Sequence, residues 1–221
     1  MFTKIYYFLH KKLSKPEERG EYSAGLWQDA VREKVFSLCK DNQGKILEIG
    51  CGEGLFLQRI AKDEKFSNVI GLDIWRDILS RCRNRLEDAA IGTVKLVQAD
   101  AGRLPFKAAA LDSVVCINVF FNLASEEVVC SVLEEIARVC KKGGTVIFDI
   151  RNSLNPLLFL KYKTARFYDA TVKNLPLRTY HLKKIYTYLD KYGFEVTQQK
   201  AIGFPYNMFA PIFVVRAKKI L

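Results

Sequence analysis

Apolar residues recur in short continuous runs from about residue 45 onward, and amphipathic stretches separate these runs. Such runs are typical of buried parallel strands, whereas apolar positions three or four residues apart indicate helices. The predicted strands are residues 45–49, 69–74, 94–99, 111–119 and 145–150, and the predicted helices are residues 55–61, 76–89 and 125–140. Strands that alternate with helices predict a parallel sheet covered on both faces, with ligands bound at the carboxyl ends of the strands.

The last part of the chain follows a different pattern. Thr179 is placed to cap a helix that ends at Gly193, and residues 194–200 and 212–218 then indicate two strands with no helix between them. Strands joined without a helix are expected to pair antiparallel. The predicted fold is therefore α/β, a doubly wound seven-stranded sheet that is mostly parallel and carries an antiparallel C-terminal pair at its edge.

A glycine-rich turn follows the first predicted strand. Residues 48–54 are Glu-Ile-Gly-Cys-Gly-Glu-Gly, and glycine there permits a tight turn and a close approach of the backbone to a ligand. The spacing is Gly-x-Gly-x-Gly, whereas a dinucleotide site prefers Gly-x-Gly-x-x-Gly. Glu48 precedes the glycines and would repel a pyrophosphate but attract an ammonium group. The turn therefore favours a ligand with a cationic amino-acid end, such as S-adenosylmethionine (SAM).

Polar residues end the next three predicted strands. Asp73 lies about 20 residues after the glycines, where an acid can accept the hydroxyl protons of a ribose. Asp100 ends the third strand, where it is placed to accept the exocyclic amine of adenine, and Asn118 ends the fourth strand. Because the carboxyl ends of parallel strands meet at one edge of a sheet, these side chains are expected to surround one ligand.

These motifs together resemble the class I SAM-dependent methyltransferases, and in particular the small-molecule group that includes the ubiquinone and menaquinone methyltransferases. The resemblance covers about residues 44–150, with matching segments at 47–54, 71–74, 98–106, 111–114 and 134–144. It implies the Rossmann-like methyltransferase fold, SAM as cofactor, and an enzyme that transfers a methyl group. It also implies a cofactor site made of Glu48, Gly50, Cys51, Gly52, Gly54, Asp73, Ile74, Asp100, Ala101 and Asn118, closed by an N-terminal segment that carries Tyr22 and Trp27.

The sequence identifies no catalytic residue. Methyl transfer from a sulfonium mainly needs alignment and exclusion of water, and a general base helps only where the acceptor must lose a proton. Candidates for such a base are His181 and Tyr22, followed by His10, Asp149 and Tyr180. Cys51 has no evident base nearby, so we expect it to contact the ligand through its backbone and not to act as a nucleophile. Neither an Asn-Pro-Pro-Tyr type motif after the fourth strand nor a Pro-Cys pair is present, which argues against methylation of adenine or cytosine exocyclic amines in nucleic acid and against cytosine-C5 methylation.

The flanks of the chain carry most of its net charge of +11. Residues 151–191 contain nine basic and two acidic side chains, net +7, among aromatic and aliphatic residues. In the family an insertion after the fifth strand usually forms part of the substrate cap, so residues 151–180 are predicted to be that cap. Its basic side chains, which include Arg151, Lys161, Lys163, Arg166, Lys173 and Arg178, either attract the acceptor or form an ordinary solvated face. We expect a small acceptor that is acidic or amphipathic.

Residues 1–43 are predicted to be a helical lid, and residues 44–221 the SAM-binding domain. Within residues 1–15 the apolar side chains fall on one helical face and most lysines lie elsewhere, which suits a lid or contact with an anionic membrane. Two other functions stay open: an RNA or tRNA methyltransferase that uses the basic flanks, and a non-catalytic SAM-binding partner subunit. The sequence gives no indication of the oligomeric state.

Composition limits the compartment and the metal chemistry. Six cysteines are present without a Cys-x-x-Cys pair, and only two histidines are available to join them as ligands. This usage is typical of reduced thiols in a cytoplasmic protein with no metal site. No apolar run is long enough to cross a bilayer and the first residues lack a signal-peptide pattern, so the cytoplasm is the expected location.

Overall fold

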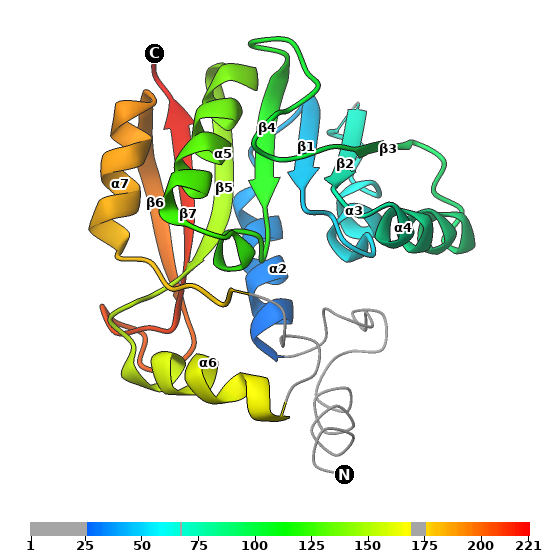
Figure 1. Ribbon diagram of the computed structural model, residues 1–221. Helices are drawn as coiled ribbons and strands as arrows, with labels where there is room; N and C mark the ends of the chain where they lie inside the picture. The colour runs from blue at the N-terminus through cyan, green and yellow to red at the C-terminus, as the bar shows by residue number, and fades with distance from the viewer. Residues whose placement is uncertain (1–25, 67, 169–175) are drawn as a thin grey trace.

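One seven-stranded sheet runs through residues 26–66, 68–168 and 176–221, which are the residues that the computed structural model describes (Figure 1). Its strands are β1 (Lys45–Ile49), β2 (Asn68–Asp73), β3 (Val94–Gln98), β4 (Leu111–Cys116), β5 (Cys140–Arg151), β6 (Phe194–Ile202) and β7 (Ile212–Lys219). They lie in the order β3-β2-β1-β4-β5-β7-β6, and the neighbours from β3 to β5 are parallel. β7 is antiparallel to both β5 and β6. The predicted sheet with its antiparallel C-terminal pair is confirmed.

Helices cover both faces of this sheet. One face is covered by α2 (Leu26–Leu38), α3 (Leu55–Ile60) and α4 (Arg76–Asp88), and the other by α5 (Glu126–Val139) and α7 (Leu182–Lys191). Ile46 and Val115 belong to the buried cluster on the first face, whereas their neighbours Leu47 and Val114 belong to the cluster on the second. Because alternate side chains enter opposite apolar layers, the central strands are apolar throughout, as the continuous runs predict.

Side-chain caps account for where two of the helices begin. At α5, the Ser125 hydroxyl accepts the backbone N–H of Val128 at 3.4 Å, as its position predicts. At α6 (Pro156–Tyr168), the side chain of Asn155 accepts the N–H of Leu158 at 2.6 Å, and Pro156 occupies the first helical position. The predicted cap segment therefore contains a helix that the apolar pattern does not reveal, although the Asn-Pro pair is a start signal.

The start of α7 differs from its prediction. The helix begins at Leu182 with His181 as its N-cap, and not directly after Thr179. The reason is a long-range pairing: the N–H of Tyr180 donates to the carbonyl of Arg151 at 2.7 Å, and the carbonyl of Tyr180 accepts from Ser153 at 3.0 Å. Residues beside Tyr180 are thus held extended next to the end of β5, and the helix can begin only after them.

The start of β5 also differs from its prediction. Residues 141–144, Lys-Lys-Gly-Gly, were expected to separate helix from strand, but β5 already begins at Cys140. Cys140 pairs with Leu111 of β4, and a register irregularity follows before regular pairing resumes at Thr145. Gly143, with a φ of 79°, lies within this irregular stretch. The glycines therefore accommodate a distortion inside the strand.

The carboxyl ends of β1, β2, β4 and β5 meet at one edge of the sheet, toward which the arrowheads of β1 and β4 point in Figure 1. α6 and the connection between β6 and β7 lie at that same edge. No helix within the described ranges is long and apolar enough to span a bilayer. Tyr22, His10 and the predicted helix in residues 1–15 lie outside the described residues, and the proposed boundary at residue 43 stays a prediction.

Candidate functional site

The glycine turn between β1 and α3 has the conformation that its composition predicts. Gly50, Gly52 and Gly54 have φ angles of 67°, 54° and 79°, a region that side-chain-bearing residues rarely adopt. A Cβ atom on Gly50 would lie 2.5 Å from the side chain of Val119, and one on Gly54 would lie 2.6 Å from the sulfur of Cys82. A Cβ atom on Gly52 would meet nothing within 4 Å. Packing therefore requires the outer two glycines, whereas Gly52 borders open space that a ligand can enter.

Glu48 lies on β1 just before this turn and is only 4% exposed. Its Oε2 atom has no hydrogen-bond partner among the described residues. Burial raises the pKa of the carboxyl well above its ordinary range, and the nearby Arg32 opposes this shift. A buried carboxylate oxygen without a partner is costly unless a ligand satisfies it. This atom, on the residue two positions before Gly50, fits an ammonium-bearing ligand such as the amino-acid end of SAM.

Asp73 ends β2 and holds the glycine turn from the neighbouring strand. Its Oδ2 accepts the backbone N–H of Gly52 at 3.0 Å, and its Oδ1 accepts that of Trp75 at 3.1 Å. A carboxylate has further lone pairs, so these bonds leave Asp73 able to accept a ribose hydroxyl. The brace to Gly52 is a role that the sequence pattern does not reveal. Ile74 and Trp75, which follow, are 50% and 65% exposed and leave an apolar surface beside this carboxylate.

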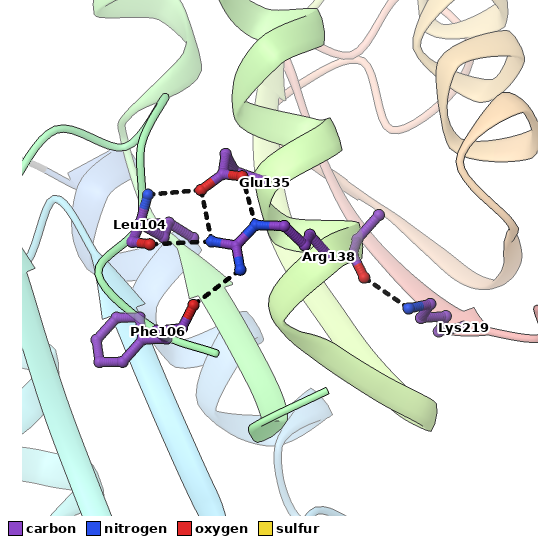
Figure 2. A network of polar contacts seen from close by, with 6 residues as sticks. Leu104, Phe106, Glu135, Arg138 and Lys219 are labelled. Carbon is purple, nitrogen blue, oxygen red and sulfur yellow. Dashed lines mark hydrogen bonds and ion pairs between the residues drawn. The ribbon is translucent and has the colours of Figure 1, made fainter. Parts of the chain in front are cut away.

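The turn after β3 carries Asp100 and Ala101, the two residues expected on the adenine side. Asp100 accepts the N–H of Gly102 at 2.7 Å through Oδ1, which fixes the local turn. A polar network then joins the turn to α5 (Figure 2). Glu135 accepts the N–H of Leu104 at 2.7 Å and is paired with Arg138, whose guanidinium donates to the carbonyls of Leu104 and Phe106. α5 thereby positions the turn that presents Asp100 and Ala101.

A second network lies at the ends of β4 and β5. Arg151, only 4% exposed, pairs with Asp149 at 2.9 Å and donates to the side-chain oxygen of Asn118 at 2.5 Å. The backbone N–H of Asn118, which has a φ of 58°, donates to the other oxygen of Asp149 at 2.6 Å. Burial raises the pKa of Asp149, and Arg151 opposes this shift. Arg151 was expected to be one of the basic side chains that either attract the acceptor or form a solvated face, and its burial against Asp149 corrects both expectations.

Two aromatic residues complete this network, and sequence reasoning gave them no special role. The Nε–H of Arg151 donates to the hydroxyl of Tyr162, which comes from α6, at 3.1 Å. Phe121 lies in the short 3-10 helix Phe120–Asn122, and its ring centre is 4.5 Å from the guanidinium carbon of Arg151 and 6.3 Å from the ring centre of Tyr162. Since Val119 packs against Gly50, this aromatic and cationic wall adjoins the glycine turn.

Trp27 of α2 lies on the cap side of the molecule. The Nζ atom of Lys161 is 4.4 Å from the centre of its ring, and a Cβ atom on Gly203 would lie 3.5 Å from its Nε1 atom. Trp27 therefore joins α2 to α6 and to the segment after β6. Closure of the site by Trp27 stays a prediction.

The candidate bases that the structure describes are placed as follows. His181 is exposed at the start of α7, where its side chain makes no cap hydrogen bond. The hydroxyl of Tyr180 donates to the carbonyl of Phe120 at 2.8 Å, and burial raises its pKa to about 12, so it stays protonated at neutral pH. Both oxygens of Asp149 are occupied by the partners described above. Tyr180 and Asp149 are thus engaged in contacts within the fold and His181 is exposed, and the assignment of a base stays a prediction.

Cys51 is buried beneath the glycine turn next to Cys82. A hydrogen bond to Cys82 and burial both raise the pKa of the Cys51 thiol, so it is not a thiolate at neutral pH. The backbone N–H of Cys51 donates to the carbonyl of Leu72 at 3.0 Å, which ties the turn to β2. These contacts are consistent with the prediction that Cys51 is not a nucleophile.

Comparison with known proteins adds independent findings. Residues 46–144 match the family described as a methyltransferase domain. The chain is 31% identical over 154 residues to phosphatidylethanolamine N-methyltransferase of Cereibacter sphaeroides. The aligned region covers 66% of this chain and 71% of that protein. It is 31% identical over 121 residues to demethylmenaquinone methyltransferase of Lactococcus lactis. That aligned region covers 54% of this chain and 47% of that protein.

The fold is also similar to solved structures. Magnesium protoporphyrin IX methyltransferase from Synechocystis, a crystal structure with bound SAH, superposes with a TM-score of 0.66 at 17% identity. The superposition covers 87% of this chain and 81% of that one. At this identity the similarity shows that the two chains share a fold.

Proposed function

This chain belongs to the SAM-dependent methyltransferases, and on that premise we propose that it transfers the methyl group by in-line displacement to a small acceptor that is amphipathic or acidic. When bound, SAM supplies a methyl carbon that its positive sulfur already activates. The remaining task of the protein is to grip the cofactor, exclude water and align the acceptor.

The carboxyl edge of β1, β2 and β3 would hold the cofactor. Glu48 and the open side of the turn at Gly52 would bind the amino-acid end, since Glu48 offers an unpartnered oxygen there. Asp73 would accept the ribose hydroxyls, while Asp100 and Ala101 would lie against the adenine. The exposed side chains of residues 74 and 75 would supply apolar contact on the same side. These roles are proposals that follow the family resemblance and agree with the geometry.

One observation carries the acceptor side of this proposal. The wall made of Arg151, Phe121 and Tyr162 adjoins the glycine turn and combines aromatic rings with a guanidinium. Asp149 already balances the charge of Arg151, so the wall favours an amphipathic acceptor over a simple anion. Further positive charge comes from exposed cations such as Arg178, whose backbone N–H donates to the carbonyl of Phe121. The named substrates of the two relatives described above are compatible with such an acceptor.

Transfer of a radioactive methyl group from labelled SAM tests this proposal. The full chain is incubated with a cell extract that is afterwards separated into an organic-solvent fraction, an aqueous small-molecule fraction and an RNA fraction. We expect the label in the organic fraction, and no label in any fraction with a Glu48→Gln variant. Label in RNA alone would replace this function with an RNA methyltransferase, and no label in any fraction would support a non-catalytic SAM-binding subunit.

A further inference from the structure

Exposed apolar side chains gather on two segments at the carboxyl edge of the sheet. Of the thirteen large apolar residues that are exposed in the described chain, eight lie on these segments. Four come from α6 and the residue pair before it, namely Leu154, Leu157, Phe159 and Leu160. Four come from the connection between β6 and β7, namely Phe204, Tyr206, Met208 and Phe209. Their exposed fractions run from 37% to 80%, so the surrounding fold leaves much of this surface in contact with water.

Buried hydrogen bonds fix the two segments to each other. The side-chain amide of Asn152 donates to the carbonyls of Met208 and Ala210 at 2.9 and 2.8 Å, and that of Asn155 donates to the carbonyl of Phe209 at 2.7 Å. Asn152 and Asn155 are themselves 1% and 3% exposed. Figure 1 shows α6 and the β6–β7 connection at the same end of the molecule. The two segments that carry the exposed apolar side chains are therefore held against each other at one end of the molecule.

The charge of this surface is positive. Residues 154–163 contain two basic residues, Lys161 and Lys163, and no Asp or Glu, and residues 203–211 contain no charged residue. Lys163 is exposed on α6, with its Nζ atom 5.6 Å from the ring centre of Phe159, so a cation stands beside an exposed aromatic ring. Apolar side chains rimmed by lysine, without carboxylates, complement a layer of anionic headgroups over hydrocarbon.

We propose that residues 154–163 and 204–209, here named the α6 surface, dock this enzyme on an anionic lipid bilayer. Leucine and phenylalanine side chains that stand outward from a helix and a turn can enter the headgroup region, while lysine heads stay at the phosphates. An RNA ligand would instead need a row of cations at the phosphates, whereas most of this surface is apolar. Because the α6 surface lies at the same edge as the glycine turn, docking would turn the acceptor side of the enzyme toward the bilayer. This inference goes beyond the proposed acceptor, since it holds for a water-soluble acceptor as well.

Co-sedimentation of the full chain with vesicles tests the proposal. We expect binding to vesicles that contain equal parts of phosphatidylcholine and phosphatidylglycerol, and much weaker binding to phosphatidylcholine alone. The variants Leu157→Ser with Phe159→Ser, and Phe204→Ser with Tyr206→Ser, should each weaken partitioning by at least about tenfold because apolar area no longer leaves water. Lys163→Gln should weaken it by about fivefold, and added salt should reduce this difference.

Ile220→Ser with Leu221→Ser is a matched control. These residues are similarly exposed but lie at the C-terminus, at the opposite end of the sheet from α6 (Figure 1). The control should bind vesicles like the unaltered chain, and SAM affinity should be unchanged in every variant. That second readout separates a failure of docking from a failure of the methyltransferase function.

Several outcomes would overturn the proposal. One is vesicle binding that the α6-surface variants leave intact, above all if deletion of residues 1–15 abolishes it, because the anchor would then be the N-terminal segment. Another is a chain that does not bind vesicles but forms a dimer that the same variants dissociate, in which case a second copy covers the surface. Retention on RNA that depends on the α6 surface would likewise replace the bilayer as the partner.

Discussion

The proposed cofactor side and the proposed acceptor side of the site are built in different ways, although they share one edge of the sheet. On the cofactor side, Glu48, Asp73 and Asp100 each stand at or near the end of their own strand, and their neighbours in sequence supply the adjacent turns. On the acceptor side, one buried guanidinium, that of Arg151, joins residues from three separate elements.

This difference predicts which substitutions should change SAM affinity and which should change the stability of the fold. On the cofactor side, Glu48 has an oxygen with no partner in the described chain, so its loss should change SAM affinity with little effect on folding. A side chain in the Arg151 network holds the fold together, so its loss should change stability with little effect on SAM affinity. Variants of single residues can therefore separate the two sides.

The largest effect is expected for Arg151→Met. Asp149 would lose its cation while buried, and the free energy of unfolding should fall by about 3–5 kcal/mol in chemical denaturation. The double variant Asp149→Asn with Arg151→Met should recover most of this loss, since no buried charge is left without a partner. Lys184→Met, which breaks the exposed pair with Glu126, is the control and should change stability little. Equal losses for both single variants would show that the Arg151 network contributes no more than a surface pair.

Glu48→Gln should have the next largest effect, on cofactor binding alone. Loss of a buried carboxylate opposite an ammonium group should weaken SAM binding by about 100-fold in calorimetry. The apo protein should stay folded, because the change removes a buried carboxyl whose Oε2 has no partner in the described chain. Glu195→Gln, at an exposed position on β6, is the control. An unchanged dissociation constant would remove Glu48 from the cofactor site.

Gly52→Ala should have a smaller effect that combines backbone strain with ligand contact. Gly143 makes a close control, since it also has a positive φ and a Cβ atom there would also meet nothing within 4 Å. Both alanine variants should lose about 1–2 kcal/mol of stability, because alanine disfavours this backbone conformation. Only Gly52→Ala should also weaken SAM binding, by about tenfold, which is about 1.4 kcal/mol. Equal SAM affinities in the two variants would mean that the ligand does not approach Gly52.

The pKa of Glu48 predicts proton release on cofactor binding. Burial raises that pKa, so the free carboxyl holds a proton at pH values where an ordinary glutamate does not. A bound ammonium would lower the pKa, so SAM binding should release up to one proton per site and tighten as pH rises toward the raised pKa. In the apo protein the same shift favours folding below the ordinary glutamate pKa, and this contribution is lost as pH rises through the raised value. Calorimetry in buffers of different ionisation enthalpy measures the release, which should vanish in Glu48→Gln.

Tyr162→Phe should have the smallest effect, and it should change the stability and the rate of methyl transfer but not the affinity for SAM. It removes the hydroxyl that accepts from Arg151 while it keeps the ring beside Phe121, so stability should fall by about 0.5–1.5 kcal/mol. The rate of methyl transfer should fall severalfold at constant SAM affinity. Tyr186→Phe, which removes a hydroxyl bonded to Gln199, is the control and should leave the rate unchanged. A weakened SAM affinity in Tyr162→Phe would show that the two sides are not separable.

The strand and glycine turn on the proposed cofactor side could be predicted because their information is local. A continuous apolar run predicts β1 as residues 45–49, and the glycines directly after it predict the turn. Asp73 and Asp100 were placed by the rule that ligands bind at the carboxyl ends of parallel strands. The cap of α5 by Ser125 is local as well, because the hydroxyl reaches a backbone N–H three residues on.

The rest depends on contacts between distant residues. Tyr162 is one aromatic residue among several in its segment, and nothing near it in sequence shows that it meets Arg151. The burial of Arg151 depends on Asp149 and Asn118, which two different strands deliver. The true start of α7 likewise follows from the pairing of Tyr180 with the end of β5. The hydrophobic pattern along the chain predicts which face of a strand or helix a side chain lies on. It does not predict which distant residue that side chain contacts.

Arg151 connects α6 to the segment that follows β4. Through Tyr162 this one guanidinium is bonded to α6, and through Asn118 it is bonded to the residue that precedes Val119, which packs against Gly50. α6 and the residues beside the glycine turn therefore share one buried side chain. If the α6 surface docks as proposed, the docked helix would be bonded directly to the network that borders the proposed cofactor site.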